Sequence, residues 1–488
     1  MNYKLISRFL SMILLMEVIF MFPPLLISLH DGTMNGVIGF SASMGITFAA
    51  GLLLQFLCRG YRTSFGAREG MVCTGLSWIL LSLFGALPFV ISGEIPYFID
   101  ALFEIVSGFT TTGASILPEV EALSRGMLFW RSFSHWVGGM GVLVLMLAII
   151  PSGKKGRGKG SGMSIHLLRA ESPGPDVGKL VPTIRKTAVI LYGMYFLLTI
   201  LNIIFLLAGG MPLFDSLCTA FGTAGTGGFG IKNDSIAGYS PYIQNVCTVF
   251  MILFGVNFSC YYLLFARKFR DFFRDSELRV YFGIILGSIA VIAWNIHGMY
   301  DTLEETIRHA AFQVGSIITT TGFATTDFDL WPNLSKAILL CLMVVGACAG
   351  STGGGLKCSR LILLFKSMRR SVHEVLHPNQ VCRIRYNGRS VDESVMKNLN
   401  NYLVAYVAII GASYLILSFD GFSSTTNFSA VLACFNNIGP GLDLVGPTCN
   451  YSMFSLIPKL VLIFDMLAGR LEIYAILLLF TKSTWRRH

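Results

Sequence analysis

The stretch Thr319-Thr320-Thr321-Gly322-Phe323-Ala324 decides the fold, because three related glycine tracts recur elsewhere in the chain. These are Thr110-Thr111-Thr112-Gly113-Ala114-Ser115, Gly225-Thr226-Gly227-Gly228-Phe229-Gly230 and Asn436-Asn437-Ile438-Gly439-Pro440-Gly441. Each tract follows a short helix-like stretch, and two long apolar segments flank each such pair. Four copies of one unit in a single polypeptide predict a ring around an axis, and rings of backbone carbonyls at membrane depth make ion selectivity filters.

The composition places the chain in a membrane. Of its 488 residues, 53% are hydrophobic and only 13% are charged, which is too apolar for a soluble protein of several domains. The mean hydropathy is +0.65. A span needs about 20 apolar residues to cross about 30 Å of hydrocarbon. Ten runs reach that length, near residues 6–28, 37–57, 71–93, 132–151, 186–208, 240–266, 278–298, 333–350, 398–419 and 455–480.

The basic residues indicate the orientation of the chain. Those behind the net charge of +10 gather at both termini and in every second loop, around residues 59–68, 154–179, 267–279 and 357–389. By the positive-inside rule these loops and both termini are cytoplasmic, so topology accounts for the charge and no nucleic acid is expected. The basic start of the chain also fits a signal peptide, but its long apolar run without a small-residue cleavage site favours an uncleaved first span.

The opposite loops are acidic, and two interpretations stay open. These loops hold carboxylates such as Glu94, Asp100, Glu104, Asp215 and Asp443. An acidic vestibule would raise the local concentration of cations. The same asymmetry would also arise if it only recorded topology, since acidic residues are weak orientation signals.

The cysteines and histidines form no catalytic or metal-binding pattern. Eleven cysteines are scattered mostly through the apolar runs with no CxxC pair, and eight histidines show no cluster at ligand spacing. We therefore expect the cysteines to be packing residues. Because no nucleophile, metal or acid-base set converges, the sequence predicts that the chain is not an enzyme.

The short stretch before each tract predicts a half-helix. These stretches cover residues 100–110, 214–223, 306–318 and 427–435, each too short to cross the membrane. A half-helix that enters from outside points its negative C-terminal end at the axis, which favours a cation. Glycine permits positive φ in the extended tract, and threonine offers a further hydroxyl oxygen. With no acidic residue in any tract, the site suits a monovalent alkali cation better than Ca²⁺ or Mg²⁺.

Two simpler interpretations of the tracts compete with this one. A single tract would be a tight turn between helices, but four in register favour a shared site. The second tract also satisfies G-x-G-x-x-G through Gly225, Gly227 and Gly230, yet no strand precedes it, so no dinucleotide site is expected there.

A second glycine cluster interrupts the eighth apolar run. Its members are Gly346, Ala347, Cys348, Ala349, Gly350, Ser351, Thr352, Gly353, Gly354, Gly355, Leu356 and Lys357. Leu356 stands where a Walker loop demands lysine, so phosphate binding is unsupported. A helix with this insert should break inside the membrane, which is permitted where the backbone lines a cavity. The break is either a moving gate beneath the filter or a passive kink that eases helix packing.

The last apolar run carries four unusual residues, Asp465, Gly469, Arg470 and Glu472. Ionisable groups inside a span are costly unless they pair or face water. We expect Arg470 to face the pore, as an electrostatic barrier below the filter that bonds to carbonyls of residues 346–355. The alternative is a salt bridge between Arg470 and Asp465 or Glu472.

Three further segments have patterns of their own. His135-Trp136-Val137-Gly138-Gly139-Met140-Gly141 gives the fourth run a small-residue face, and we expect it to serve helix packing. The basic, glycine-rich residues 153–160 predict a flexible linker near lipid headgroups. Residues 167–175 either dock a partner or form a simple turn.

Together these motifs resemble the Trk, Ktr and HKT superfamily of potassium transporters, and specifically its bacterial Trk-type membrane subunits. The resemblance covers the whole chain and rests on the four tracts and on four segments in family order. These segments are WVGGMG at 136–141, LLRAESPGP at 167–175, AGSTGGGLK at 349–357 and AGRLE at 468–472.

The fold that the resemblance implies is an all-α polytopic membrane protein. Two extra N-terminal transmembrane helices precede four pseudo-symmetric repeats of helix, pore helix, filter and helix around one central pore. The extra helices would take residues 1–68, and the repeats residues 69–183, 184–274, 275–394 and 395–488, with the gating loop at 346–357 in the third.

The resemblance also implies the roles of individual residues. The ligands of K⁺ would be mainly carbonyls of Thr111, Thr112, Gly225, Thr226, Thr320, Thr321, Asn437 and Ile438, with Gly113, Gly227, Gly322 and Gly439 as the filter glycines. Residues 346–357 would form the gating loop, and Arg470 would be the pore arginine that opposes it. K⁺ is the only ion implied, and no organic cofactor is.

Partners and location follow from the same resemblance. Family members form homodimers in the bacterial inner membrane, and Trk members rest on a cytosolic ring of regulatory subunits that bind nucleotides of the NAD, ATP or ADP type. That ring would contact the basic inner loops.

The expected function is potassium uptake, and its selectivity and coupling stay open. The first threonine is replaced by Gly225 in the second tract, and Asn437 and Ile438 stand in the fourth, so a filter that also passes Na⁺ or Rb⁺ is possible. The membrane potential alone would drive uptake with about 2.3 kcal/mol per charge per 100 mV. The alternative is a secondary transporter that couples K⁺ to H⁺ or Na⁺, although no chain of midplane acidic residues suggests a proton relay.

Overall fold

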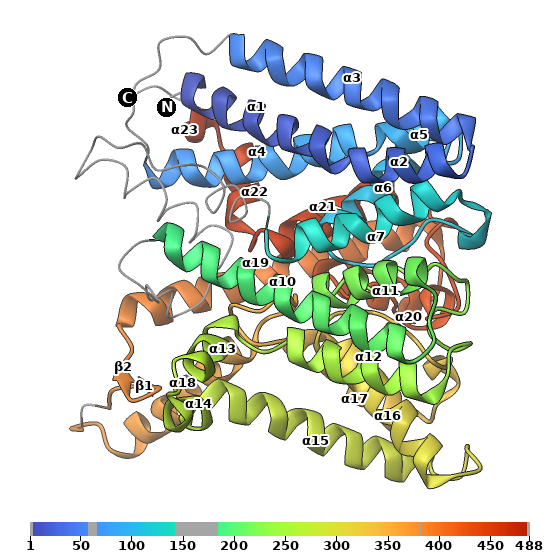
Figure 1. Cartoon of the computed structure of the whole chain (residues 1–488). Helices are drawn as coiled ribbons and strands as arrows, with labels where there is room; N and C mark the ends of the chain where they lie inside the picture. The colour runs from blue at the N-terminus through green and yellow to red at the C-terminus, as the bar shows by residue number, and fades with distance from the viewer. Residues whose placement is uncertain (1–2, 57–65, 142–183, 381, 486–488) are drawn as a thin grey trace.

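The computed structural model describes residues 3–56, 66–141, 184–380 and 382–485, and these ranges are mostly helical (Figure 1). The predicted linker at 153–160 and the patterned loop at 167–175 lie outside the described residues. The one sheet in the described part is a hairpin of two short strands, β1 (Arg385–Tyr386) and β2 (Arg389–Ser390).

The chain begins with helices that pack on one flank of the molecule. They are α1 (Tyr3–Phe20), α2 (Phe22–His30), α3 (Met34–Phe56), α4 (Ala67–Gly85) and α5 (Leu87–Ser92). Prolines in the first turns of α2 and α5 restart a helix after a short break. The hydroxyl of Tyr3 donates to the carbonyl of Trp485, so the two ends of the described chain meet at the same end of the molecule.

The remaining helices of the described chain begin at Phe98 and end at Trp485. They are α6 (Phe98–Phe109), η1 (Val120–Ala122), α7 (Arg125–Gly139), α10 (Ile184–Ala208), α11 (Leu213–Gly225), α12 (Pro241–Phe254), α13 (Phe258–Phe265), α14 (Phe269–Arg274), α15 (Ser276–Ile296), α16 (Leu303–Ile318), η2 (Phe328–Leu330), α17 (Asn333–Val345), α18 (Cys358–Leu376), α19 (Glu393–Leu417), η3 (Ser418–Asp420), α20 (Ser424–Phe435), η4 (Asp443–Val445), α21 (Leu456–Arg470), α22 (Tyr474–Phe480) and α23 (Lys482–Trp485).

Four short helices end at the glycine tracts, as the sequence predicts. These helices, α6, α11, α16 and α20, have 12, 13, 16 and 12 residues. At 1.5 Å per residue they reach about 18–24 Å, which is less than the hydrocarbon thickness. We call them the pore helices, because each stops inside the protein at a buried tract.

The number of unbroken spans is smaller than the ten apolar runs suggest. Within the residues that the structure describes, six helices or helix pairs are long and apolar enough to cross a membrane, and a seventh qualifies if α12 and α13 count as one span bent by 91°. The sequence predicts a break only at residues 346–357, but α12 and α13 are separated at Gly255, and α21 and α22 at Leu471. The predicted spans 240–266 and 455–480 therefore each contain a helix break that the sequence did not signal.

Hydrogen bonding explains the break between α12 and α13. The Gly255 carbonyl accepts from the Cys348 N–H at 3.1 Å, and the Phe258 N–H donates to the Gly350 carbonyl at 3.0 Å. Asn257 caps the restarted helix, since its side chain accepts from the Ser259 N–H at 2.9 Å. The backbone groups that the break exposes are thus used by residues 346–357 of the next unit.

The pore helices pack in a closed cycle with the helices α7, α12, α17 and α21 that follow them. Each pore helix contacts the helix that follows it, in the pairs α6 with α7, α11 with α12, α16 with α17 and α20 with α21. Each also contacts the corresponding helix of the preceding unit, in the pairs α11 with α7, α16 with α12, α20 with α17 and α6 with α21. The last pair returns to the first unit, so the four units surround one axis.

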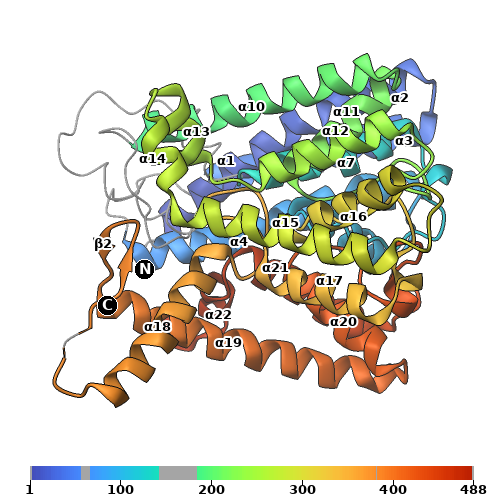
Figure 2. The same cartoon turned by 90° about the horizontal axis from the view of Figure 1, so that it is seen from below.

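The two ends of the molecule carry different structural elements. The pore helices lie towards one end, whereas α18, the β hairpin and both chain ends lie at the other, as two perpendicular views show (Figures 1 and 2). The outer helices α3, α10, α15 and α19 are apolar yet only 22–33% buried, which suits contact with lipid.

Candidate functional site

The four pore helices end with the same backbone turn. Thr111, Thr226, Thr320 and Asn437 have φ of 57°, 55°, 59° and 55°. In each tract the following N–H bonds to a carbonyl five residues back, with N···O distances of 2.8 to 2.9 Å. This is the Schellman arrangement, which satisfies the last carbonyls of a helix. A non-glycine residue in this conformation costs about 1–2 kcal/mol, and the fold maintains it four times.

A glycine with positive φ stands two residues after each of these positions. The four are Gly113, Gly228, Gly322 and Gly439, with φ of 81°, 75°, 85° and 97°. In the second tract the equivalent glycine is Gly228. It lies one residue after Gly227, the filter glycine that the resemblance implies. Gly225 is still the last residue of α11 and corresponds to Thr110. The predicted register of the second tract was therefore wrong by one residue.

The four tracts meet and close a ring. A Cβ atom added to Gly113 would lie 2.0 Å from the carbonyl oxygen of Gly227, and one on Gly228 would lie 1.9 Å from that of Thr321. The series continues with Gly322 at 2.1 Å from the Ile438 oxygen, and Gly439 at 2.7 Å from the Thr112 oxygen. Each glycine thus faces the carbonyl of the next tract, and the fourth tract returns to the first.

The oxygens at the ring are uncharged, and several hydroxyls are already bonded. Thr110 and Thr112 share a hydroxyl hydrogen bond of 2.8 Å, and Thr319 and Thr321 share one of 2.7 Å. Asn437 Nδ2 donates to Thr112 Oγ1 at 2.9 Å. These side chains hold the tracts to one another, so backbone carbonyls are the main oxygens left for an ion. Within the described residues, no three His, Cys, Asp or Glu side chains group to hold a metal.

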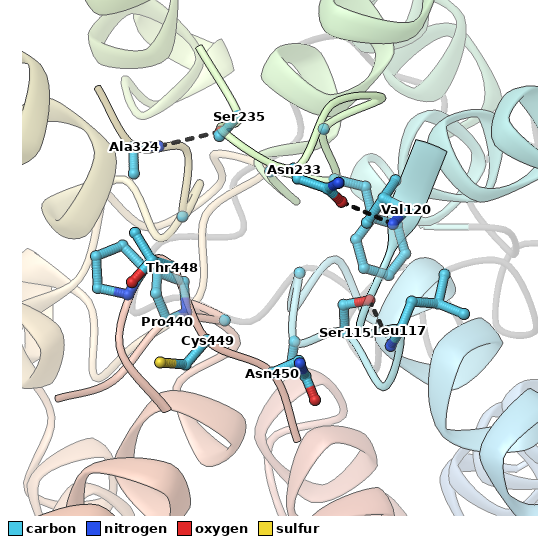
Figure 3. A pocket seen from close by; sticks show the side chains of 18 of the residues that line it. Ser115, Leu117, Val120, Asn233, Ser235, Ala324, Pro440, Thr448, Cys449 and Asn450 are labelled. Atoms are coloured by element: carbon cyan, nitrogen blue, oxygen red, sulfur yellow. Dashed lines mark hydrogen bonds between the residues drawn. The ribbon is translucent and has the colours of Figure 1, made fainter. Parts of the chain in front are cut away.

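A cavity opens beside the ring, and residues from all four tracts line it (Figure 3). Ser115, Asn233, Ala324 and Pro440 lie around it, together with Cys449. None of the described lining residues is acidic, whereas Arg131 and Lys232 are among them. The interpretation of an acidic vestibule is therefore not favoured.

The outer acidic residues instead hold loops and helix ends. Glu94 accepts from the backbone and side chain of Ser124, and Asp100 pairs with Lys459 at 2.7 Å. Hydroxyl donors hold the pKa of Asp443 below its usual value, with Ser423 contributing more than Thr426. These roles fit the alternative that the acidic side mainly records topology.

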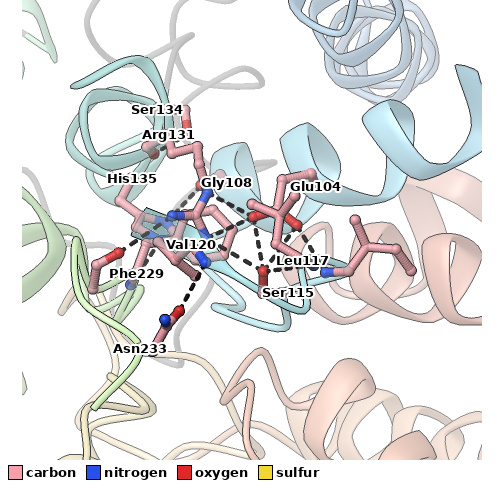
Figure 4. A network of polar contacts seen from close by, with 12 residues as sticks. Glu104, Gly108, Ser115, Leu117, Val120, Arg131, Ser134, His135, Phe229 and Asn233 are labelled. Atoms are coloured by element: carbon pink, nitrogen blue, oxygen red, sulfur yellow. Dashed lines mark hydrogen bonds and ion pairs between the residues drawn. The ribbon is translucent and has the colours of Figure 1, made fainter. Parts of the chain in front are cut away.

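The sequence analysis grouped Glu104 with the acidic loop residues, but in the structure Glu104 lies on α6 and forms a fully buried ion pair (Figure 4). Its carboxylate lies 2.7 Å from the Arg131 guanidinium and accepts from the Ile116 N–H at 2.9 Å. Arg131 also donates to the Gly230 carbonyl at 3.2 Å and lies over the Phe229 ring at 4.1 Å. One ion pair therefore ties the outer ends of the first and second tracts to α6 and α7.

Residues 346–357, the interrupted segment, lie directly against the third and fourth tracts. The Gly354 N–H donates to Thr320 Oγ1 at 2.6 Å, and the Gly355 N–H donates to the Asn436 carbonyl at 3.1 Å. Gly346, Gly350 and Gly355 have positive φ. The predicted break is confirmed, and it touches the tracts themselves.

Arg470 connects this segment to the first unit. It donates to the Thr352 carbonyl at 2.8 Å and to the carbonyls of Gly138 and Gly139 at 2.6 and 2.5 Å. The acidic residues of the alternative interpretation have other partners, since Glu472 pairs with Arg360 and Asp465 accepts from Ser413. The expected bond between Arg470 and a carbonyl of residues 346–355 is confirmed.

The small-residue face at 136–141 packs as predicted. A Cβ on Gly138 would lie 1.8 Å from the Phe109 carbonyl oxygen, and one on Gly139 would lie 2.7 Å from the Gly225 Cα. The glycines of α7 therefore let this helix contact the ends of two pore helices.

Glu277 holds the interrupted segment, and the sequence interpretation missed it. Its Oε1 accepts from the N–H groups of Ala349 at 2.7 Å and Ser359 at 2.9 Å, and its Oε2 accepts from the Tyr386 hydroxyl at 3.3 Å. Tyr386 belongs to the β hairpin, so this carboxylate links the hairpin to the segment. Because a glutamate in the first turn of a helix is common, the sequence carries no signal of this role for Glu277.

Comparisons with known proteins agree on one family. The family model TrkH, described as cation transport protein, matches residues 39–486. The chain is similar to the Trk system potassium uptake protein TrkH of Salmonella typhimurium, with 36% identity over all of both chains. It is 34% identical to TrkG of Escherichia coli, over 96% of this chain and 95% of that protein. The crystal structure of the potassium transporter TrkH from Vibrio parahaemolyticus superposes over all of both chains with a TM-score of 0.87 and 31% identity.

Proposed function

The chain belongs to the TrkH family of cation transport proteins, and from that premise we propose that it is the membrane subunit of a potassium uptake system. The observation that carries this proposal is the closed ring, in which each tract's glycine faces a carbonyl oxygen of the next. The relatives are potassium uptake proteins and not enzymes.

The selectivity filter would consist of three equivalent positions in each tract. In the register of the structure these are Thr111, Thr112 and Gly113, then Thr226, Gly227 and Gly228, then Thr320, Thr321 and Gly322, then Asn437, Ile438 and Gly439. Their carbonyls would replace the hydration shell of K⁺. The C-terminal ends of four pore helices add negative potential at the same place.

The gate would be the interrupted segment together with Arg470. The segment lies against the third and fourth tracts, and the guanidinium bonds to it and to the end of α7. A fixed positive charge next to the path of a cation is a barrier. Opening would require Arg470 to release the Thr352 carbonyl and the segment to move away from the tracts.

The proposed surroundings are the bacterial inner membrane, with both termini in the cytoplasm and a homodimer as the assembly. The adjacent chain ends support a common side for both termini. The same end carries α18 and the hairpin, where Arg369, Arg370, Arg383, Arg385 and Arg389 are clustered in the sequence. A cytosolic nucleotide-binding regulatory ring would contact this basic end, and no nucleic acid is involved.

Ion-coupled transport is the second candidate function, and two buried carboxyl groups support it. Both carboxylate oxygens of Glu17 in α1 are buried without a hydrogen-bond partner among the described residues, and so is Oδ2 of Asp465 in α21. Buried ionisable groups in membrane helices often mark proton or ion pathways. Coupling of K⁺ to H⁺ or Na⁺ would use such groups.

The test is ⁸⁶Rb⁺ uptake by purified protein in liposomes, with wild type compared with Gly113→Ala and Gly411→Ala. A Cβ at Gly113 would overlap the Gly227 carbonyl, whereas nothing lies within 4 Å of one at Gly411 in exposed α19. We expect uptake to be lost or unselective only in Gly113→Ala. Equal uptake in both variants contradicts the filter assignment. Uptake that stops when a H⁺ or Na⁺ gradient is collapsed at constant potential supports the coupled transporter.

A further inference from the structure

We infer that His135 is a specificity-determining positioning residue of the filter, and that its imidazole replaces the side chain that the second tract lacks. The inference rests on the proposed function, because it assigns a role within the proposed filter. It concerns a residue that the sequence interpretation placed only in a packing segment.

The four tracts differ at their middle position, which is the residue directly before Gly113, Gly228, Gly322 or Gly439. Thr112, Thr321 and Ile438 have β-branched side chains that are fully buried, but the equivalent residue of the second tract is Gly227. Gly227 does not have a positive φ, so its backbone conformation does not demand glycine. The reason for the glycine must lie in the space around it.

That space is filled by the ring of His135. A Cβ added to Gly227 would lie 2.1 Å from Nδ1, 2.3 Å from Cγ and 2.5 Å from Cε1 of His135. The histidine is fully buried on α7. A side chain on Gly227 and the imidazole cannot both be present, so the glycine and the histidine are a complementary pair.

The ring also makes hydrogen bonds at both nitrogens (Figure 4). Nδ1 lies 2.8 Å from the Gly108 carbonyl oxygen, and Nε2 lies 3.2 Å from the backbone nitrogen of Phe229. Because the Phe229 N–H donates, Nε2 must be the acceptor and Nδ1 must carry the proton. The neutral ring therefore joins the last turn of α6 to the residue that follows Gly228.

In the other three tracts, side chains of the tracts themselves make the hydrogen bonds near the middle position. Hydroxyl pairs connect Thr110 to Thr112 and Thr319 to Thr321, and the Asn437 amide donates to Thr112. The second tract has no residue of its own for this task at the middle position. His135 supplies from α7 both the volume and the hydrogen bonds, and in this way sets where the carbonyls of Gly227 and Gly228 lie.

The experiment measures the ratio of Rb⁺ to Na⁺ flux in liposomes for His135→Ala, for His135→Ala with Gly227→Thr, and for Ser134→Ala. Ser134 is a buried neighbour on α7 whose hydroxyl donates to the Arg131 carbonyl, so it is the matched control. We expect His135→Ala to lower the ratio about tenfold, the scale of one lost discriminating contact. The double variant should recover part of that loss, and Ser134→Ala should keep the wild-type ratio.

The outcomes separate this inference from the proposed function. Unchanged selectivity in His135→Ala, with K⁺ uptake intact, overturns the inference and leaves the function standing. Absence of K⁺ uptake in the wild type overturns the function itself. If His135→Ala does not fold, Gly227→Ala decides, because its methyl group should disturb selectivity while His135 is present. A normal flux ratio in folded Gly227→Ala would overturn the complementary pairing.

Discussion

The two halves of the carbonyl ring are supported in different ways. The first and second tracts are held by regular helices, through Glu104 of α6 and through Arg131 and His135 of α7. The third and fourth tracts are held in part by the interrupted segment, whose Gly354 and Gly355 bond to them without regular secondary structure. The half formed by the first and second tracts is therefore held by regular helices, and we call it the fixed half. The half formed by the third and fourth tracts, the movable half, is bonded to the interrupted segment that we propose to move.

The largest effect is expected on the fixed half, from Arg131→Met. Removing the guanidinium leaves the buried Glu104 carboxylate unpaired, which costs about 3–5 kcal/mol. We expect a large fall in the apparent melting temperature of the purified protein. The control is Arg125→Met on the same helix, whose pair with Asp31 is partly exposed at the arginine, and a pair at the surface is worth about 0–1 kcal/mol. Equal melting shifts in the two variants would mean that the buried pair does not hold this half.

The next effect tests the connection between the halves, through Arg470→Ala. This change removes the bonds to Thr352, Gly138 and Gly139 together with the positive charge. Basal Rb⁺ flux without a regulatory partner should rise by about tenfold or more, which corresponds to about 1.4 kcal/mol. Lys397→Ala, an exposed basic residue of α19, is the control for loss of charge. If Arg470→Ala leaves the flux at the wild-type level, the guanidinium is structural only.

A smaller effect is expected on the movable half, from Glu277→Gln. A neutral amide keeps the size of the side chain but weakens its bonds to the Ala349 and Ser359 N–H groups, by about 1–2 kcal/mol in total. Basal flux should rise while the Rb⁺ to Na⁺ ratio stays the same, because the fixed half is untouched. A change in that ratio with no change in basal flux would contradict the division into two halves.

The smallest effect is expected from Tyr386→Phe, which removes only the 3.3 Å bond to Glu277. The loss of one such bond is worth about 0.5–1.5 kcal/mol. Basal flux should change little, whereas activation by a cytosolic partner should weaken if the hairpin transmits its binding. Flux measured with and without the partner separates these two outcomes. Full activation in Tyr386→Phe would remove the hairpin from the path of regulation.

The ring was predictable from the sequence because its unit is repeated four times. Each pore helix ends within two residues of the predicted end, since an apolar stretch stops at a conspicuous glycine tract. The register of the second tract was not predictable from spacing, because Gly225, Gly227 and Gly228 are all glycines and only the backbone conformation distinguishes them. The domain boundaries and the roles of the filter residues stay predictions.

Contacts between residues that are distant in the sequence were the part that the sequence could not reveal. Glu104 and Arg131 lie on different helices, and Glu104 looked like one more acid of the outer side. The break after Phe254 has a single glycine as its local signal, and its cause is the bonding of Gly255 and Phe258 to a segment almost 100 residues later. Arg470 was found because a charge inside an apolar run is conspicuous on its own.

The closed order of glycine against carbonyl also bears on how such a chain diversified. If the four units arose by duplication of an ancestral gene segment, each copy inherited a partner in the next, and a bulkier residue at any one of these glycines would collide with its neighbour. Divergence was therefore constrained by the neighbouring carbonyl at Gly113, Gly228, Gly322 and Gly439, and at the middle position of the second tract by the ring of His135 beside Gly227. In every copy, the glycine that faces the next tract should therefore tolerate substitution poorly.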